Sequence, residues 1–273
     1  MIPNDFITAW RTHAPWTIDA QVEQDLVISR ALVEIFRVPA LGRSLLSRGG
    51  TALYKLYFTP AARYSEDIDL VQVRSEPIGD TIDLLRSVLG PWLGSPKRQL
   101  KEGRVNLVYR FQSEDVPPLK LRLKIEINTR EHFSHLDRTN VPLSVDSDWY
   151  RGQADIPTFA LDELLGTKLR ALYQRRKGRD LFDLSYAMKS GRISIPDIIA
   201  CFQRYMTEGG YTVSRAQFEA NLVAKRRFPA FREDVGPLLR PGILWDFGEA
   251  FTVVMDEIIA RLPGESWKGE GFW

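Results

Sequence analysis

Residues 119–127 alternate strictly between apolar and polar side chains, which limits this segment to a strand with one buried face. The apolar positions are Leu119, Leu121, Leu123, Ile125 and Ile127, and the positions between them are Lys120, Arg122, Lys124 and Glu126. A similar alternation runs through Val105, Leu107, Tyr109 and Phe111, and Pro117-Pro118 separates the two segments. We therefore expect two neighbouring strands of one sheet.

The region before these strands mixes helix and strand patterns. Residues 17–38 carry apolar side chains at three- and four-residue spacing and predict an amphipathic helix. The segment from Leu45 through Gly49-Gly50-Thr51 to Leu53 predicts a strand, a turn and a helix that begins at Ala52, with Thr51 as its cap. A second strand is expected over 67–73 and a helix over 78–93.

Helical patterns dominate after about residue 150, at 159–176, 179–189, 195–206, 214–225 and 243–261. Glycine, proline and asparagine between 137 and 158 indicate a domain boundary. We expect a core at 1–150 that includes the N-terminal helix, and a helical domain at 151–273 that completes the active-site cleft. The expected class is α+β, with a mixed sheet followed by a helical C-terminal region.

Composition restricts location and partners. The 273 residues carry a net charge of only +2, so any nucleic-acid contact must be local. Cys201 is the only cysteine, which excludes an intramolecular disulfide and fits a reducing compartment. The N-terminus has no basic region followed by an apolar run, and no apolar stretch reaches the length of a membrane span. We expect a cytoplasmic protein without membrane contact.

Asp67 and Asp69 are the first candidate catalytic residues. Side chains alternate along a strand, so both carboxylates project from the same face. Magnesium commonly binds through one or two carboxylates together with substrate phosphates. The preceding Gly49-Gly50-Thr51 turn offers backbone N–H groups and a helix N-terminus to phosphate. A solvated Asp-x-Asp turn and a glycine pair needed only for tight turning are the alternatives.

Glu126 is a candidate third carboxylate because it shares a polar strand face with Lys120, Arg122 and Lys124. The alternative is a surface ladder of alternating charges. Under either interpretation, the three cations can line a path for phosphates.

Two further clusters lie in the helical half. Lys168 falls in line with the apolar stripe of its helix, where it either snorkels out of the core or binds a triphosphate in a cleft. We expect its removal to keep or raise stability, since a partly buried charge is relieved. Further on, Arg175, Arg176, Lys177 and Arg179 form a basic turn before Asp180 and Asp183. Here we expect Asp180 near a helix N-cap and an ion pair at i, i+4 between Arg179 and Asp183. The basic turn is either a solvated surface or a binding site for the acceptor.

Four motifs in order resemble the AbiEii/AbiGii toxin family of type IV toxin–antitoxin systems, within the polymerase-β-like nucleotidyltransferase superfamily. They are Gly49-Gly50-Thr51-Ala52-Leu53-Tyr54-Lys55, Arg63-Tyr64-Ser65-Glu66-Asp67-Ile68-Asp69-Leu70, Lys168-Leu169-Arg170-Ala171-Leu172 and Arg179-Asp180-Leu181-Phe182-Asp183-Leu184. The resemblance covers roughly residues 45–190.

The resemblance implies a nucleotidyltransferase that moves a nucleoside monophosphate from an NTP to RNA such as tRNA and is restrained by an antitoxin. It implies catalytic roles for Asp67, Asp69, Lys168 and Asp183, with Mg²⁺ or Mn²⁺ on Asp67 and Asp69 and, by extension, Glu126. Nucleotide contacts are expected from Gly49, Gly50, Thr51, Arg63, Ser65 and Lys168, and acceptor contacts from Arg175, Arg176 and Lys177. Three alternatives stay open: a metal-dependent nuclease, a kinase-like phosphotransferase, and a non-catalytic module that binds RNA or antitoxin.

Overall fold

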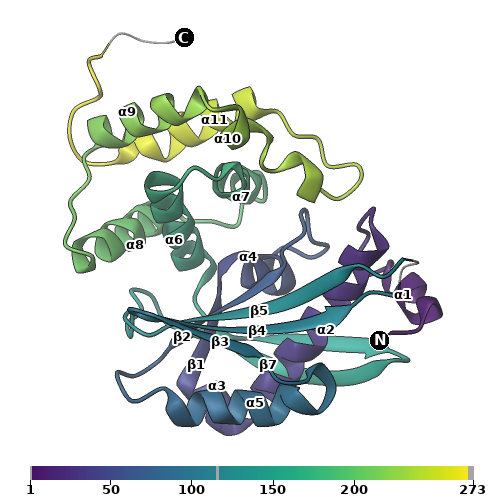
Figure 1. The fold of residues 1–273 in the computed structure, drawn as a ribbon. Coiled ribbons are helices and arrows are strands. Elements are labelled where there is room, and N and C mark those ends of the chain that lie inside the picture. Colours follow the sequence, from purple (N-terminus) through teal and green to yellow (C-terminus); the bar gives the residue numbers. More distant parts are fainter. Residues whose placement is uncertain (1, 115–116, 270–273) are drawn as a thin grey trace. The chain divides into compact units, whose positions relative to one another are not determined.

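The computed structural model describes residues 2–114 and 117–269. The chain forms two compact units (Figure 1). The sheet unit comprises Met1–Phe159 and Leu239–Ile243, and the helical unit comprises Ala160–Leu238 and Leu244–Trp273. Residues 239–243 return to the sheet unit because Leu239 bridges Arg63 and the Arg240 amide donates to the Ala62 carbonyl.

Within the described residues, the sheet unit contains a seven-stranded mixed sheet of order β3-β4-β5-β2-β1-β7-β6. Strand β1 is antiparallel to β2 and parallel to β7, β2 is parallel to β5, and the other neighbours are antiparallel. The predicted α+β class with a mixed sheet is confirmed. The strands are β1 Leu45–Arg48, β2 Asp67–Gln72, β3 Lys97–Lys101, β4 Arg104–Gln112, β5 Lys120–Asn128, β6 Thr139–Ser147 and β7 Tyr150–Thr158.

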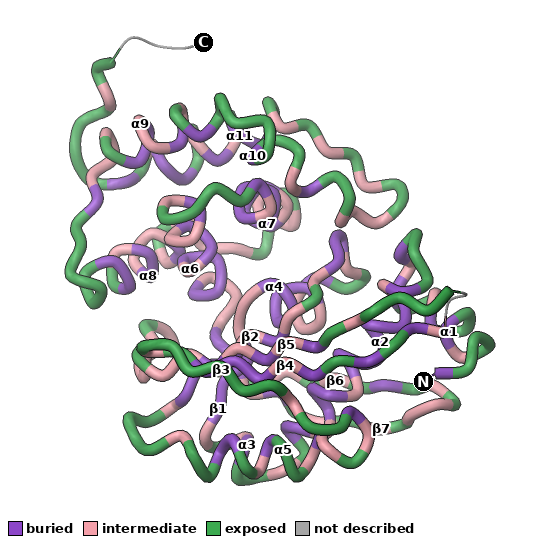
Figure 2. The backbone as a smooth tube through the Cα atoms, in the orientation of Figure 1, coloured by how far each residue is buried: buried purple, intermediate pink, exposed green. Residues whose placement is uncertain are grey.

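Helices cover the apolar face of this sheet. Helix α2 packs against β5 and β7, and α5 packs against α2 and β4. The alternation in β2 and β5 places Ile68, Ile125 and Ile127 in this core, where each is fully buried. Figure 2 shows buried stretches of backbone among the central strands of the sheet. The helices of the unit are α1 Asn4–Trp10, α2 Asp19–Phe36, α3 Pro39–Ser44, α4 Gly49–Ala52, the π-helical turn η1 Leu53–Tyr57, and α5 Gly79–Leu93.

The stretch 137–158, expected as a boundary, instead forms the hairpin β6–β7 at one edge of the sheet. Proline lacks an N–H group, so Pro142 and Pro157 make these strands look like a loop in the sequence. An edge position tolerates both, since β7 meets β1 at a single pair, Ser47 and Thr158. The compact sheet unit thus extends to Phe159.

The helical unit follows the predicted helices closely. Helix α6 packs against α7, α8 and α9, and its apolar stripe buries Leu165, Leu169 and Leu172. Among the described helices, none is both long and apolar enough to cross a membrane. The elements are α6 Leu161–Gln174, α7 Gly178–Lys189, α8 Ile195–Glu208, α9 Arg215–Arg226, α10 Pro229–Glu233, η2 Gly236–Leu238, α11 Phe247–Glu257 and η3 Ile259–Arg261.

Candidate active site

Three carboxylates gather on the polar face of the sheet unit. The parallel register of β2 and β5 pairs Asp67 with Lys124 and Asp69 with Glu126. Paired residues of neighbouring strands project from the same face, so Glu126 lies beside the two aspartates. The side chains of Asp67 and Glu126 are 26% and 21% exposed, which leaves them accessible at the edge of a packed core. This long-range pairing brings the predicted acids together.

Lys124 lies between the acids. Its ammonium donates to Asp67 Oδ2 at 2.7 Å and lies 3.4 Å from Glu126 Oε2. Burial lowers the pKa of Lys124, but the hydrogen bond to Asp67 and the charges of Asp67, Glu126 and Asp69 outweigh it, and the net pKa is raised. Arg104 of β4 lies 3.1 Å from the other oxygen of Glu126. Two cations therefore balance the acidic cluster.

Asp67 and Asp69 fit a divalent cation. Asp67 Oδ1 is buried and accepts no hydrogen bond from the described residues, so one hard oxygen ligand is left over. No group of three acid, histidine or cysteine side chains in the described chain is arranged to hold a metal. Glu126 instead faces Lys124 and Arg104. Two carboxylates with substrate phosphates nevertheless satisfy the usual coordination of magnesium.

The Gly49-Gly50 turn sits directly against these residues. Gly49 has a φ of 79°, and a Cβ at this position would overlap the Asp69 carboxylate. A Cβ at Gly50 would lie 2.9 Å from Arg63 Nη2 and 2.9 Å from Ser65 Oγ. Both glycines therefore allow a close approach of the backbone to these side chains, and Gly49 also has the positive φ that favours glycine. The glycine pair therefore lies directly beside Asp69, Arg63 and Ser65.

Thr51 has a different role from the predicted cap. Helix α4 begins at Gly49, so Thr51 lies inside it, and its hydroxyl donates to the Asp67 carbonyl and shares a hydrogen bond of 3.0 Å with the Ser65 hydroxyl. The glycine pair belongs to the helix rather than preceding it, so the helix starts three residues earlier than the sequence pattern suggests. Thr51 thus fixes the turn to the start of β2.

Arg63 and helix α2 make contacts that stabilise the strands carrying the site residues. Arg63 is 2% exposed, donates from Nη1 to the Tyr64 carbonyl at 3.0 Å, and stacks 4.9 Å from the Tyr54 ring centre. The Gln24 amide of α2 donates to the Arg122 carbonyl at 2.7 Å and more weakly to the Glu66 carbonyl at 3.4 Å. These contacts hold β5 and the start of β2 in register.

A second cluster of predicted residues lies within the helical unit. Lys168 of α6 places its ammonium 2.8 Å from Asp183 Oδ2 and 3.5 Å from Asp180 Oδ1, both on α7. Both aspartate side chains are fully buried, and the lysine side chain is 8% exposed. Arg175 donates to both oxygens of Asp180 at 2.7 and 2.8 Å. Lys168 therefore neutralises buried acids, and simple snorkelling does not describe it.

The basic turn has its own partners in the helical unit. Arg179 lies 3.5 Å from Asp234 and Lys177 lies 3.2 Å from the same residue. The predicted pair between Arg179 and Asp183 is wrong, because Asp183 turns inward to Lys168. Asp180 is the third residue of α7 and buried, whereas the N-cap position is Lys177. Arg176 packs over the Phe228 ring at 4.1 Å.

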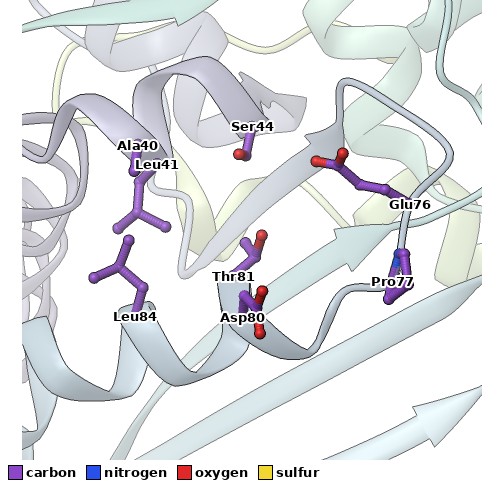
Figure 3. A pocket seen from close by; sticks show the side chains of 8 residues that line it. All are labelled: Ala40, Leu41, Ser44, Glu76, Pro77, Asp80, Thr81 and Leu84. Atoms are coloured by element: carbon purple, nitrogen blue, oxygen red, sulfur yellow. The ribbon is translucent and has the colours of Figure 1, made fainter.

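Sequence reasoning did not find the partners that organise both clusters. The sequence pattern places Lys124 on the same strand face as Glu126 and predicts a contact with phosphates, but it does not predict the ion pairs of Lys124 with Asp67 and Glu126. Arg104 and the Arg175–Asp180 pair left no usable pattern, because they depend on cross-strand register and on interhelical packing. A hollow of about 350 Å³ lies between α3 and α5, where Ser44 and Glu76 contribute to its wall (Figure 3). It adjoins the start of β1 and the end of β2, whereas Asp67 lies at the start of β2, and none of the predicted site residues lines it.

Known structures define the class of this fold. The nucleotidyltransferase toxin MenT4 from Mycobacterium tuberculosis matches with a TM-score of 0.65 and 18% identity, over 94% of this chain and 90% of that one. A putative nucleotidyltransferase from H. pylori matches with a TM-score of 0.50 and 18% identity, over 84% and 90%. No curated protein sequence matches the chain. The fold is that of a nucleotidyltransferase.

The chain belongs to the AbiEii family. The model of this family, described as nucleotidyl transferase AbiEii toxin of type IV toxin–antitoxin systems, matches residues 30–253. That span includes both carboxylate clusters and the Gly49-Gly50 turn. The predicted family and the assignment as a nucleotidyltransferase are confirmed.

Proposed function

We propose that the chain is a toxin that transfers a nucleoside monophosphate from an NTP to a hydroxyl of RNA, such as tRNA, with release of pyrophosphate. The observation that carries the proposal is the convergence of Asp67, Asp69 and the Gly49-Gly50 turn on one face of the sheet unit. Membership of a toxin–antitoxin family supports a cognate antitoxin as partner. We place the protein in the cytoplasm, where NTPs and RNA are both present.

Asp67 and Asp69 would hold Mg²⁺ or Mn²⁺, with Glu126 as an additional ligand if it leaves Lys124 and Arg104. A bound divalent cation supplies Lewis-acid polarisation of phosphoryl oxygens and a template for in-line displacement. The residues of the chain position the substrate: backbone N–H groups of the Gly49-Gly50 turn, the Thr51 hydroxyl, Arg63 and Ser65 orient the triphosphate. The acceptor oxygen forms a bond to the α-phosphorus as the bond to the β-phosphate oxygen breaks.

Lys168 and Asp183 also contribute to catalysis in this proposal. The ammonium of Lys168 offers a compact charge to a triphosphate or a leaving pyrophosphate. Asp183 orients that ammonium through the 2.8 Å contact. The basic turn of Arg175, Arg176 and Lys177 remains a proposed acceptor contact, although Arg175 already serves Asp180. The predicted boundary at residue 150 falls at the start of β7, so we propose the core as the sheet unit 1–159 with 239–243, and the remainder of the chain as the helical domain.

One labelling experiment separates this proposal from its rivals. Purified protein is incubated with Mg²⁺, cellular RNA and each NTP, labelled in turn at the α- and at the γ-phosphate. Transfer predicts α-label on full-length RNA and γ-label in pyrophosphate. Shortened RNA without NTP consumption would indicate a nuclease. Label from the γ-phosphate on protein would indicate a kinase-like enzyme, and no chemistry at all would leave a binding module.

A further inference from the structure

The polar face of the sheet continues beyond the carboxylates onto β5, β4 and β3, which lie side by side in Figure 1. The register places Lys124 opposite Val108, and Val108 opposite Lys97. It likewise places Glu126 opposite Asn106, and Arg122 opposite Arg110. These positions share the face that carries Asp67 and Asp69. We call this set the basic face, with the exposed cations Lys97, Lys101, Arg104, Arg110, Lys120 and Arg122.

Most of this positive charge is not balanced. Within residues 2–114 and 117–269, no ion pair involves Lys97, Lys101, Arg110 or Lys120. Two members of the set have an acidic neighbour: Glu126 lies by Arg104, and also by Lys124, and Glu66 is 4.0 Å from Arg122. An unbalanced row of cations on an otherwise near-neutral chain is a local anion-binding surface.

The register also places like charges against each other. Arg110 stands directly opposite Arg122, and Lys101 directly opposite Arg104. Like charges at directly opposed positions destabilise a sheet. A neighbouring acid offsets only one member of each pair, with Glu126 at Arg104 and Glu66 at Arg122, so Lys101 and Arg110 have no acidic partner among the described residues. A polyanionic ligand would relieve the repulsion.

A buried polar atom links the basic face to the carboxylates. Asn106, opposite Glu126, is only 8% exposed, and its Oδ1 accepts no hydrogen bond from the described residues. A buried acceptor without a donor is costly unless a ligand supplies one. A sugar hydroxyl or a base amino group is such a donor. The basic face is therefore continuous with a polar position beside the predicted metal ligands.

We propose that the basic face binds the phosphate backbone of the RNA acceptor and leads its reactive end to Asp67 and Asp69. This inference rests on the proposed nucleotide transfer to RNA. Successive cations of β5 lie about 6.8 Å apart along the strand, which suits a ligand with repeated charges. A protein partner would need an apolar centre, and Val108 is the apolar side chain that the register places among these cations. The composition favours RNA.

The test compares two neighbouring residues of β3. Lys97 belongs to the basic face, while Arg98 pairs with the buried Leu107 on the opposite face. We would measure the affinity of a fluorescent single-stranded RNA between about 50 and 200 mM salt. The variants are the triple change Lys97→Ala, Arg110→Ala and Lys120→Ala, and Arg98→Ala as the matched control. The triple variant should lower the slope of log K against log salt by about 2, with about 0.7 per lost contact.

Several outcomes would overturn the proposal. The slope could stay unchanged in the triple variant, or Arg98→Ala could lower it as much per charge. Polyglutamate could compete as well as RNA, with the same dependence on the variants, which would identify an acidic protein as the occupant. If the wild type transfers nucleotide to RNA but the triple variant leaves the salt slope unchanged, this inference fails and the proposed function stands. If the triple variant lowers the slope but the wild type transfers no nucleotide, RNA binding by the basic face stands and the proposed function fails.

Discussion

At the scale of single residues, Lys168 shows how burial sets the consequence of a charge. Its ammonium lies within 3.5 Å of two fully buried aspartates. Removing one partner of a buried ion pair leaves an uncompensated charge in the core. We expect Lys168→Met to lower the free energy of unfolding by about 3 kcal/mol, measured by urea denaturation. The sequence-based expectation of kept or raised stability is wrong in its premise, because the lysine is not a lone charge.

Lys177→Met is the matched control for this measurement. Lys177 also forms an ion pair with an aspartate, Asp234, but its side chain is 47% exposed. Solvent screens such pairs, so a loss below about 1 kcal/mol is expected. Equal stability of Lys168→Met and the wild type would contradict the assigned neutralising role.

Residue identities in the site were predictable to the extent that they depend on local pattern. Asp67 and Asp69 follow from strand alternation alone. Their proximity to Glu126 depends on a parallel pairing between segments more than fifty residues apart, which alternation cannot specify. The position of Lys124 between the acids follows from the same register. The sequence pattern therefore predicts the acidic residues of the cluster and not their ion pairs with Lys124 and Arg104.

At the scale of elements, the junction of β1 and α4 at Gly49 brings the backbone close to the Asp69 carboxylate. Gly49→Ala would place a methyl group against Asp69 at a positive φ. We expect nucleotide transfer to fall about 100-fold, since displacement of about 1 Å in a reacting group has effects of this size. Gly79→Ala at the start of α5 meets nothing within 4 Å and should leave transfer unchanged. Equal activity of both variants would show that close approach at Gly49 is not required.

The C-terminal end of α6 depends on a buried lysine. Lys225 of α9 donates to the carbonyls of Leu172 and Tyr173, and burial lowers its pKa to about 8. Between about pH 8 and the ordinary lysine pKa near 10.4, the unfolded chain binds more protons than the folded one, so stability rises with pH. We expect wild type to gain on the order of 1 kcal/mol per pH unit over Lys225→Met in this window. Parallel pH profiles of the two proteins would contradict the assignment.

The predictability of elements follows their hydrophobic pattern. Helix α2 buries most of its residues and strand β5 buries every second residue from Leu123 to Ile127, and the sequence pattern predicts both elements, and β4, to within a few positions. Strand β3 is exposed along its length and carries no apolar alternation, whereas β6 alternates Val141, Leu143 and Val145 but contains Pro142 and buries only Val145. Both lie at edges of the sheet, where pairing with one neighbour holds a strand that buries few side chains.

At the scale of the whole molecule, metal binding should be visible as stability. A ligand that binds only the folded state raises the free energy of unfolding by about 2.7 kcal/mol at a hundred times its Kd. We expect Mn²⁺ to raise the thermal midpoint of the wild type and to have little effect on an Asp67→Asn, Asp69→Asn double variant. An equal rise in both proteins would place the metal elsewhere.

The central claim is that Asp67 and Asp69 serve nucleotide transfer and are not needed for folding. The most direct measurement is the transfer of α-phosphate label from NTP to RNA by wild type, Asp67→Asn and Asp69→Asn, with the thermal midpoints of the three proteins recorded separately in the absence of divalent metal. The account predicts labelled RNA from the wild type alone and closely similar midpoints, because asparagine keeps the shape of the side chain and loses the charge that binds metal. Undiminished labelling by either variant would contradict it.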